Sequence, residues 1–408
     1  MEPKHYRWVI CGAGMIALFC TGGLLITGFN VYTPYLISEG GLSDAEVSLV
    51  LLVRNLFSLL SMFLVVPMIR KLDIRLNITI AVLSGAAAFA VFSAAQHVLL
   101  FCLGMALAGF AYGTGGMVSV SVVIKRWFDD HDGLALGICA AGTGLSAVIG
   151  APVITAMVES RSMRYSMGVE AGFLAAVAVL LFAMIRNYPS REKQEAVCRE
   201  RQQKTAVHGR YEAFDLSPAA KYALFLGVLL CGMSYTVSPF LTVLFREKGF
   251  DAVTVGWLSA FMGLVLCVGK CIYGAAADWL GQFRAGNVFH GCYVLGVLMC
   301  AVCIPGSKVM AYTAMTLLGI GFPMLSVGIS QLAAATARKE EYYADAVRKL
   351  QMTYMLGTVV FSTVPGVLAD CVGSYVPSYY ILTAVALGAA ALQQGVLRKN
   401  GTLSKGEN

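Results

Sequence analysis

The stretch GAAADWLGQFR, residues 274–284, joins two long apolar runs of the chain by a short turn with a basic end. VPMIRKLDIR, residues 66–75, stands in the same place between two apolar runs of the first half. Each turn follows an even-numbered apolar run, so the pattern of the first half returns in the second. We therefore predict a chain built from two similar sets of helices.

The composition is that of a protein embedded in lipid. Hydrophobic residues make up 58% of the 408 residues and charged residues only 13%, whereas soluble domains carry about 25% charged residues. A helix needs about 20 apolar residues to cross a bilayer, and no strand-period alternation occurs. We predict an all-α membrane protein with twelve spans, at 8–32, 45–69, 74–96, 97–123, 134–158, 168–187, 220–245, 252–277, 286–305, 309–333, 346–370 and 375–397.

The longest polar interval, residues 187–218, divides these spans six and six. We expect an N-terminal half at 1–187, a cytoplasmic linker at 188–219 and a C-terminal half at 220–408. Most of the 30 lysines and arginines fall on the side of both termini, and basic loops stay in the cytoplasm. We therefore predict a multi-pass cell-membrane protein with both termini cytoplasmic. The net charge of +7 then reflects topology, and no clustered basic face indicates nucleic-acid binding.

The second turn resembles the loop motif of the major facilitator superfamily. The residues that match are Gly274, Asp278, Gly281 and Arg284, at the spacing of that motif. The resemblance implies a fold of twelve transmembrane helices in two six-helix repeats, and it implies gating roles for these four residues. The first turn departs from the motif, because Arg70 stands where the aspartate that meets the facing half is expected.

Two further stretches narrow the resemblance. KRWFDDHDGLALGICAAGTGLSAVIGAP, residues 125–152, and GLLITGFNVYTPYLISEGGLSDAEVS, residues 23–48, are similar to segments of the oxalate/formate antiporter and monocarboxylate porter families. Asp132-Gly133 replaces the Arg-Gly of those families. The first stretch is rich in glycines that let a neighbouring helix approach closely, namely Gly137, Gly142, Gly144 and Gly150.

Lys270 is one of two cations within the predicted spans. It precedes Asp278 by eight residues, or about 12 Å along a helix, which is far for a lysine to reach the interface. The resembling families place a cation near this point, where it meets the substrate carboxylate, and this implies a substrate-binding role for Lys270. A structural pairing or snorkelling is the alternative. The families' preceding aspartate is replaced by Leu266, and the second cation of oxalate-type members is missing beside Gly357.

Arg54 is the other cation, and a charge at the centre of a span costs roughly 2.5–3.5 kcal/mol on insertion scales. Aligning the two turns pairs Arg54 with Met262, so Arg54 should lie about 12 Å nearer the outside than Lys270. No acidic residue is expected in the middle of a span, and Asp370 comes nearest. Arg54 is expected to receive an anion in the outer vestibule or to close an outer gate with Asp370. A structural arginine bonded to backbone carbonyls is the alternative.

Several aromatic and amide side chains on the spans suit a pocket for a small organic anion, because a tyrosine offers one donor and a flat apolar wall. Each is also typical of an interfacial aromatic belt. The residues expected to bind substrate besides the two cations are Tyr32, Tyr35, Tyr112, Tyr235, Gln351 and Tyr354.

These features favour a secondary active transporter, either an antiporter or a proton symporter, that moves a mono- or dicarboxylate by alternating access. Its partners would be a small organic anion, the lipid bilayer and, for symport, protons, and it would act as a monomer without cofactor or metal. An ATP-binding GxxxxGK[ST] motif is absent from the sequence. One alternative is an exporter of neutral or cationic drug-like compounds, but the predicted spans lack the membrane-embedded carboxylate that such substrates usually need. The other alternative is a non-transporting receptor. An enzyme is disfavoured because all five histidines are expected at span ends or in loops.

Overall fold

The computed structural model describes residues 3–32, 35–36, 41–42, 44–128, 130–188, 213–214, 216–337, 342–362 and 364–403. The first half contains α1 (Pro3–Leu18), η1 (Phe19–Thr27), η2 (Gly28–Tyr32), α3 (Asp44–Ala94), α4 (Val98–Gly115), α5 (Met117–Trp127), α6 (Asp132–Leu145), η3 (Ser146–Gly150), α7 (Ala151–Ser160) and α8 (Met163–Met184). The second contains α10 (Pro218–Ser234), α11 (Val237–Glu247), α12 (Ala252–Leu280), α13 (Gln282–Val302), α14 (Lys308–Gly321), η4 (Phe322–Leu325), α15 (Val327–Thr336), α16 (Tyr343–Phe361), α17 (Val364–Val372) and α18 (Val376–Leu403).

Within the described ranges, 9 helices are long and apolar enough to cross a membrane. The longest of them contains two predicted spans, because α3 changes direction at Asp73, where φ is 65° and ψ is 152°. The seventh predicted span is divided between α10 and α11, and the eleventh between α16 and α17. The predicted all-α membrane fold is confirmed. The predicted linker falls largely on residues 189–212, outside the described part, so the domain boundaries stay a prediction.

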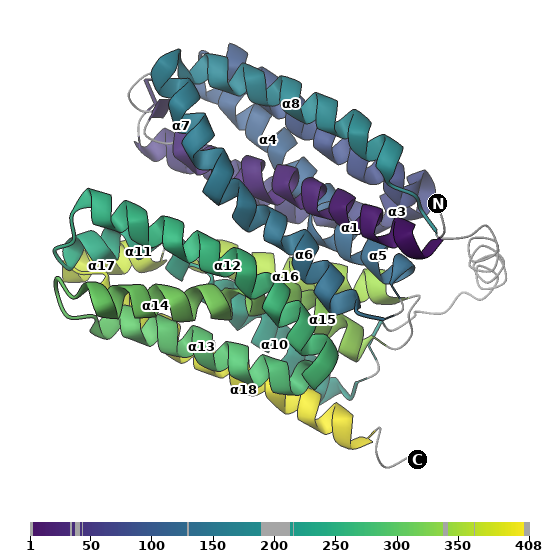
Figure 1. The fold of residues 1–408 in the computed structure, drawn as a ribbon. Coiled ribbons are helices and arrows are strands. Elements are labelled where there is room, and N and C mark those ends of the chain that lie inside the picture. Colours follow the sequence, from purple (N-terminus) through teal and green to yellow (C-terminus); the bar gives the residue numbers. More distant parts are fainter. Residues whose placement is uncertain are drawn as a thin grey trace.

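The two halves lie side by side, and both termini lie at the same end of the bundle (Figure 1). We call this the terminal end, marked by Pro3 and Leu403, and the opposite one the distal end, marked by Tyr32 and Gly306. Between the halves, α6 packs along α12, and α16 packs against α3 and α5. The line of contact between α6 and α12 therefore forms one side of the interface, and α3 with α16 forms another.

Irregular backbone occurs at corresponding places in the two halves. The first half is interrupted at η1 and η2, at Gly116 and at η3, and the second half at Tyr235, η4 and Ser362. Elements beside these interruptions, α5, α6, η3, α15 and α16, make contacts between the halves. Non-helical backbone at membrane depth is tolerated where protein buries it or where it lines a cavity, so these breaks direct attention to the interface.

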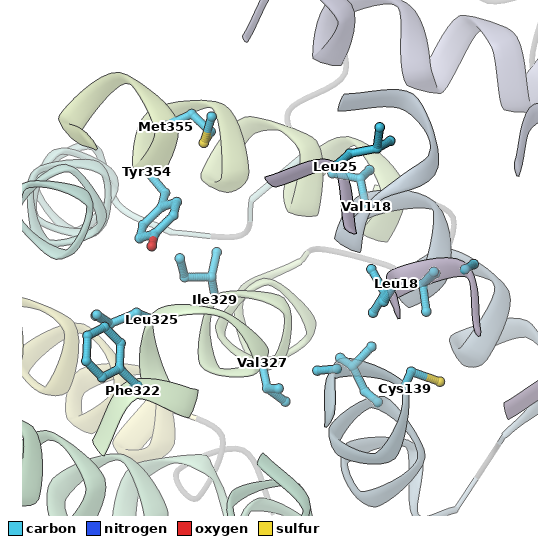
Figure 2. Packing of buried hydrophobic residues seen from close by; sticks show 14 of the residues in the cluster. Leu18, Leu25, Val118, Cys139, Phe322, Leu325, Val327, Ile329, Tyr354 and Met355 are labelled. Atoms are coloured by element: carbon cyan, nitrogen blue, oxygen red, sulfur yellow. The ribbon is translucent and has the colours of Figure 1, made fainter. Parts of the chain in front are cut away.

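Small residues bring the two halves together at the terminal end. A Cβ on Gly274 would lie 2.1 Å from the carbonyl oxygen of Gly133, and a Cβ on Gly133 would lie 2.7 Å from the carbonyl oxygen of Gly274. Neither backbone can yield, so glycine is required on both sides. Deeper in the interface apolar side chains fill the space: Figure 2 shows Val118 and Cys139 of the first half and Val327 and Ile329 of the second within one packed region.

Two expectations about polar residues are wrong. α8 begins at Met163, five residues before the predicted span, so Glu170 lies about two turns inside a helix that can cross the membrane, not at its start, and is only 4% exposed. Ser162 caps this helix by accepting from the amide of Tyr165. Because the first turn of the helix is polar, hydropathy places its start too late. His290 likewise lies inside α13 and is 3% exposed.

Candidate functional site between the halves

Lys270 lies within α12 and points across the interface to α6. Its Nζ donates to the carbonyl oxygen of Ala140 over 3.1 Å and to the hydroxyl of Thr143. The side chain is 6% exposed. Its reach depends on Gly137, since a Cβ there would lie 2.3 Å from the Lys270 carbonyl oxygen. The expected close approach of a helix to this glycine is confirmed, and it brings a cation of one half onto the backbone of the other.

Arg54 lies in the first part of α3 and is 7% exposed. Its Nη1 donates to the carbonyl oxygen of Ile26 in η1 over 3.3 Å. Its Nε is buried without a hydrogen-bond partner among the described atoms. A Cβ on Gly109 would lie 2.5 Å from the Arg54 carbonyl oxygen, so α4 presses directly against α3 at this point.

The two cations are connected through η1. A Cβ on Gly22 would lie 2.9 Å from Cγ2 of Thr143, the partner of Lys270, and 3.6 Å from a ring carbon of Tyr112. Ile26, the partner of Arg54, follows Gly22 by one turn, about 6 Å along a helix, toward the distal end. Arg54 is therefore held on the distal side of the level at which Lys270 meets α6.

Tyrosines from different helices gather near the guanidinium of Arg54. Tyr112 of α4 and Tyr235, which follows α10, both lie near it. The Tyr235 ring meets the Tyr354 ring of α16 edge-on, with 5.9 Å between centroids, and Figure 2 shows Tyr354 near Phe322 and Leu325 of η4. Tyr235 is 36% exposed in the middle of a span. Its neighbours come from both halves, so Tyr235 lies at the interface between them.

Gln351 adds an amide to this group of side chains. It lies one turn before Tyr354 on α16 and is 5% exposed, and its Nε2 has no partner among the described atoms. A buried donor without an acceptor costs roughly 1–3 kcal/mol. The Nε2 of Gln351 and the Nε of Arg54 therefore favour a ligand that brings acceptor oxygens.

Neither Arg54 nor Lys270 pairs with a carboxylate among the described side chains. The described ion pairs involve Arg70, Lys125 and Arg348 instead. Asp370, the expected gate partner of Arg54, belongs to α17, but its side chain lies outside the described part. Two buried cations held by carbonyl and hydroxyl groups leave a net positive region, and such a region concentrates anions.

Two tyrosines expected near the pathway lie elsewhere. Tyr32 is fully buried in the first half, where its hydroxyl donates to Oε2 of Glu170 over 3.2 Å and lies 2.7 Å from the hydroxyl of Ser166. Tyr35 packs, partly buried, against the same core. None of the described contacts joins either tyrosine to Arg54 or Lys270, so we leave both out of the candidate site.

The contacts that sequence reasoning missed had weak signals. Thr143 is a polar residue within the glycine-rich stretch 125–152, three residues after Ala140, so both can face one neighbour. The role of Ile26 is played by its backbone carbonyl, which no side-chain pattern reveals. Glu170 was missed because the start of its helix was placed too late.

Comparison with known proteins identifies the family. The sequence profile of the Major Facilitator Superfamily matches residues 14–344. The chain belongs to the major facilitator superfamily. It is thus a multi-pass membrane transporter, and the prediction that it is not an enzyme is confirmed.

Within the superfamily, a protein of Agrobacterium vitis described as "Putative tartrate transporter" is 22% identical over 342 residues, which are 78% of this chain and 73% of that protein. Monocarboxylate transporter 12 of Homo sapiens is 22% identical over 310 residues, 66% of this chain and 58% of its own length. The solved structure of the proton:xylose symporter XylE, bound to 6-bromo-6-deoxy-D-glucose, has a TM-score of 0.75 at 14% identity and covers 95% of each chain. This last likeness concerns the fold.

The superfamily loop motif joins the halves at the terminal end. Asp278 accepts from the amides of Gly133 and Leu134, the first residues of α6 after Asp132, over 2.9 and 2.8 Å. Its carboxylate thus lies at the positive end of a helix in the facing half, where an anion is favoured. Gly281 has a φ of 80° and ends α12, and Arg284 lies exposed in the first turn of α13.

Arg70, which replaces the motif aspartate in the first half, also reaches the facing half. Its Nη2 donates to Oδ2 of Asp345 over 2.7 Å. Asp345 lies in the first turn of α16 and also pairs with Arg348 of the same helix. The terminal end is therefore closed by contacts from both loops.

Proposed function

We propose that the protein is a secondary active transporter that carries a small organic anion, a mono- or dicarboxylate, between its two halves. The observation that carries the proposal is the pair of buried cations, Arg54 and Lys270, for which no described side chain supplies a countercharge. At 4 Å, two opposite unit charges attract by about 4 kcal/mol in an effective dielectric of 20. A carboxylate therefore neutralises the positive charge of these two side chains, which carbonyl and hydroxyl groups offset only in part.

The two cations suit alternating access because they belong to different halves. Lys270 of the second half already bonds to α6 of the first, and an anion that takes up its third N–H would add to this contact. Arg54 approaches the same region from the first half through η1. An anion between them would stabilise the approach of the halves, and its release would free them to rock apart. In this scheme Asp278, with Gly274 at the contact, and Arg70 close the terminal end.

The surrounding side chains favour a compact polar anion. Tyr112, Tyr235 and Tyr354 offer hydroxyl donors on flat walls, and Gln351 offers an amide donor. Tartrate and monocarboxylates, the substrate classes in the names of the relatives, bring carboxylate oxygens of this kind. Leu266 leaves no acid beside Lys270, so any coupling proton must bind elsewhere on the protein or on the substrate.

The setting follows from the distribution of basic residues. We propose a location in the cell membrane with both termini in the cytoplasm, so that the terminal end is the inner one. The protein would work as a monomer, by exchange of anions or by symport with protons. The energy would come from a gradient.

Counterflow in proteoliposomes tests the proposal directly. Vesicles loaded with unlabelled tartrate or lactate are diluted into a trace of the same labelled anion, and the uptake is followed. We expect the wild-type protein to take up label from at least one of them. Lys270→Ala should lower uptake at least tenfold, and Lys270→Arg should retain more of it because the charge remains. Unchanged uptake in Lys270→Ala would refute the assignment.

Lys248→Ala is the matched control. Lys248 also donates to backbone carbonyls, those of Ala301 and Cys303 at 2.8 Å each, but these contacts lie within the second half. We expect uptake by this variant to stay within twofold of wild type. A protein that is thermally stabilised by the anion yet shows no counterflow would instead be a receptor. Uptake of cationic compounds alone would favour the drug-exporter alternative.

A further inference from the structure

Glu170 is a buried carboxyl group that the proposed anion site does not use. It lies within α8 and is 4% exposed. Its Oε2 accepts from the Tyr32 hydroxyl over 3.2 Å, while its Oε1 is buried without a hydrogen-bond partner among the described atoms. The pair lies inside the first half, next to the rings of Phe29 and Phe89, which contact Tyr32.

Among the side chains that the structure describes, no cation accompanies this carboxyl group. α8 packs against α1, α3 and α7, and among the described side chains of these elements none forms an ion pair with Glu170. The titratable group that faces it is the phenol of Tyr32, whose hydroxyl also contacts the hydroxyl of Ser166, one turn before Glu170 on α8. Burying an ionised carboxylate without a cation or a full set of donors is costly, so this arrangement suits the neutral acid. Loss of the proton would require the surroundings to change.

The segment that contacts Glu170 also contacts Arg54. η1 is wound as a π-helix and η2 as a 3₁₀-helix, and such departures from α-helical pitch often mark functional hinges. The Ile26 carbonyl in η1 accepts from Arg54, and Tyr32, six residues later at the end of η2, donates to Glu170. This short segment therefore joins the two contacts directly along the chain.

We propose that Glu170 is the proton-binding site that couples anion transport to a proton gradient, with η1 and η2 connecting it to Arg54. In each cycle the carboxylate of Glu170 takes up one proton from one side of the membrane, which forms the neutral acid, and later releases it to the other side. No other bond is made or broken. The inference rests on the proposed anion transport, and it adds the coupling ion and the residue that carries it.

The test separates exchange from accumulation in the same proteoliposomes. Counterflow without a pH gradient reports exchange, and uptake driven by an imposed gradient, alkaline inside, reports coupling. We expect Glu170→Gln, which imitates the neutral acid, to keep counterflow within threefold of wild type and to lose at least tenfold in gradient-driven accumulation. Glu159→Gln is the matched control, because Glu159 lies exposed near the end of α7, and both activities should be unchanged.

Each outcome decides one of the two claims. Accumulation by Glu170→Gln at the wild-type level, or equal loss of exchange and accumulation in a folded variant, would overturn the proton assignment. Exchange by the wild type without any gradient-driven accumulation would overturn it too, while leaving the anion transporter intact. A wild type without exchange would refute the transport proposal itself. If Glu170→Gln does not fold, Tyr32→Phe is tested in its place. We expect accumulation by Tyr32→Phe to fall at least threefold more than exchange. Accumulation by this variant at the wild-type level would overturn the assignment.

Discussion

The loop after α12 and the bend within α3 occupy corresponding places in the two halves. They have the same backbone conformation but carry different side chains. Pairing Asp278 with Arg70 also pairs Gly281 with Asp73, three residues later in each case. Gly281 has φ 80° and ψ 154°, and Asp73 has φ 65° and ψ 152°. The turn is thus the same, although only Gly281 is suited to it.

The side chains at the paired positions contact the facing half in opposite ways. Asp278 brings a carboxylate to the N-terminus of α6 and accepts from its backbone. At the N-terminus of α16 the carboxylate is that of Asp345, a residue of the helix itself. Arg70 of the facing half binds it. Both helix N-termini receive the negative charge that their dipoles favour. The two halves thus share the backbone geometry of the turn. They differ in which element carries the carboxylate, which is the loop at Asp278 and the facing helix at Asp345.

The largest effect is expected from Gly274→Leu. The new side chain has no space, since a Cβ at this position would lie 2.1 Å from the backbone of Gly133. The paired residue of the first half, Val66, already carries a side chain that is 3% exposed, so Val66→Leu is the matched control. We expect transport by Gly274→Leu to fall more than tenfold and the control to keep most of it. Similar losses in both would mean that the two loops pack alike.

Asp278→Asn should have the next largest effect. Hydrogen bonds to a charged group contribute about 1.5–3 kcal/mol, and the amide replaces one acceptor oxygen by a donor that faces N–H groups. We expect the closed terminal end to be destabilised by about 2 kcal/mol, which lowers the melting temperature in detergent and slows transport. Arg70→Gln is the counterpart in the first half, and a larger loss there would reverse the comparison.

Exchanging the turn residues tests the shared backbone. A non-glycine residue in this region of φ and ψ costs of the order of 1–3 kcal/mol. We expect Asp73→Gly to raise the melting temperature and Gly281→Asp to lower it. The gain is reduced because Asp73 accepts from Asn187 over 2.8 Å at an exposed site. A lower melting temperature for Asp73→Gly would show that this hydrogen bond outweighs the strain.

The smallest effect belongs to the exposed pair of Arg70 and Asp345. The Arg70 side chain is 56% exposed, and exposed pairs contribute roughly 0–1 kcal/mol. We expect Arg70→Asp to slow transport by a few fold, because it places like charges together, and the double change with Asp345→Arg to restore most of it. A double-mutant cycle measures this coupling. Strictly additive losses would show that the pair does not hold the halves together.

Much of the architecture could be predicted because it depends on local properties. Hydropathy located the spans, the basic residues suggested an orientation, and the spacing of the two turns revealed the repeat. The same approach failed at Glu170, because a helix boundary within a polar turn is not set by hydropathy. It could not identify Arg70 as an interface residue either, since its partner lies 275 residues away.

The sequence by itself determined that the chain spans a membrane many times in two similar halves and that two cations lie inside, because burial in lipid is dictated by each segment's own residues. Only the tertiary structure decided which groups these charges meet. Lys270 bonds to Ala140, 130 residues away, and Tyr32 meets Glu170 across 138 residues. Such contacts depend on how closely distant helices pack, and glycines such as Gly137 set that distance.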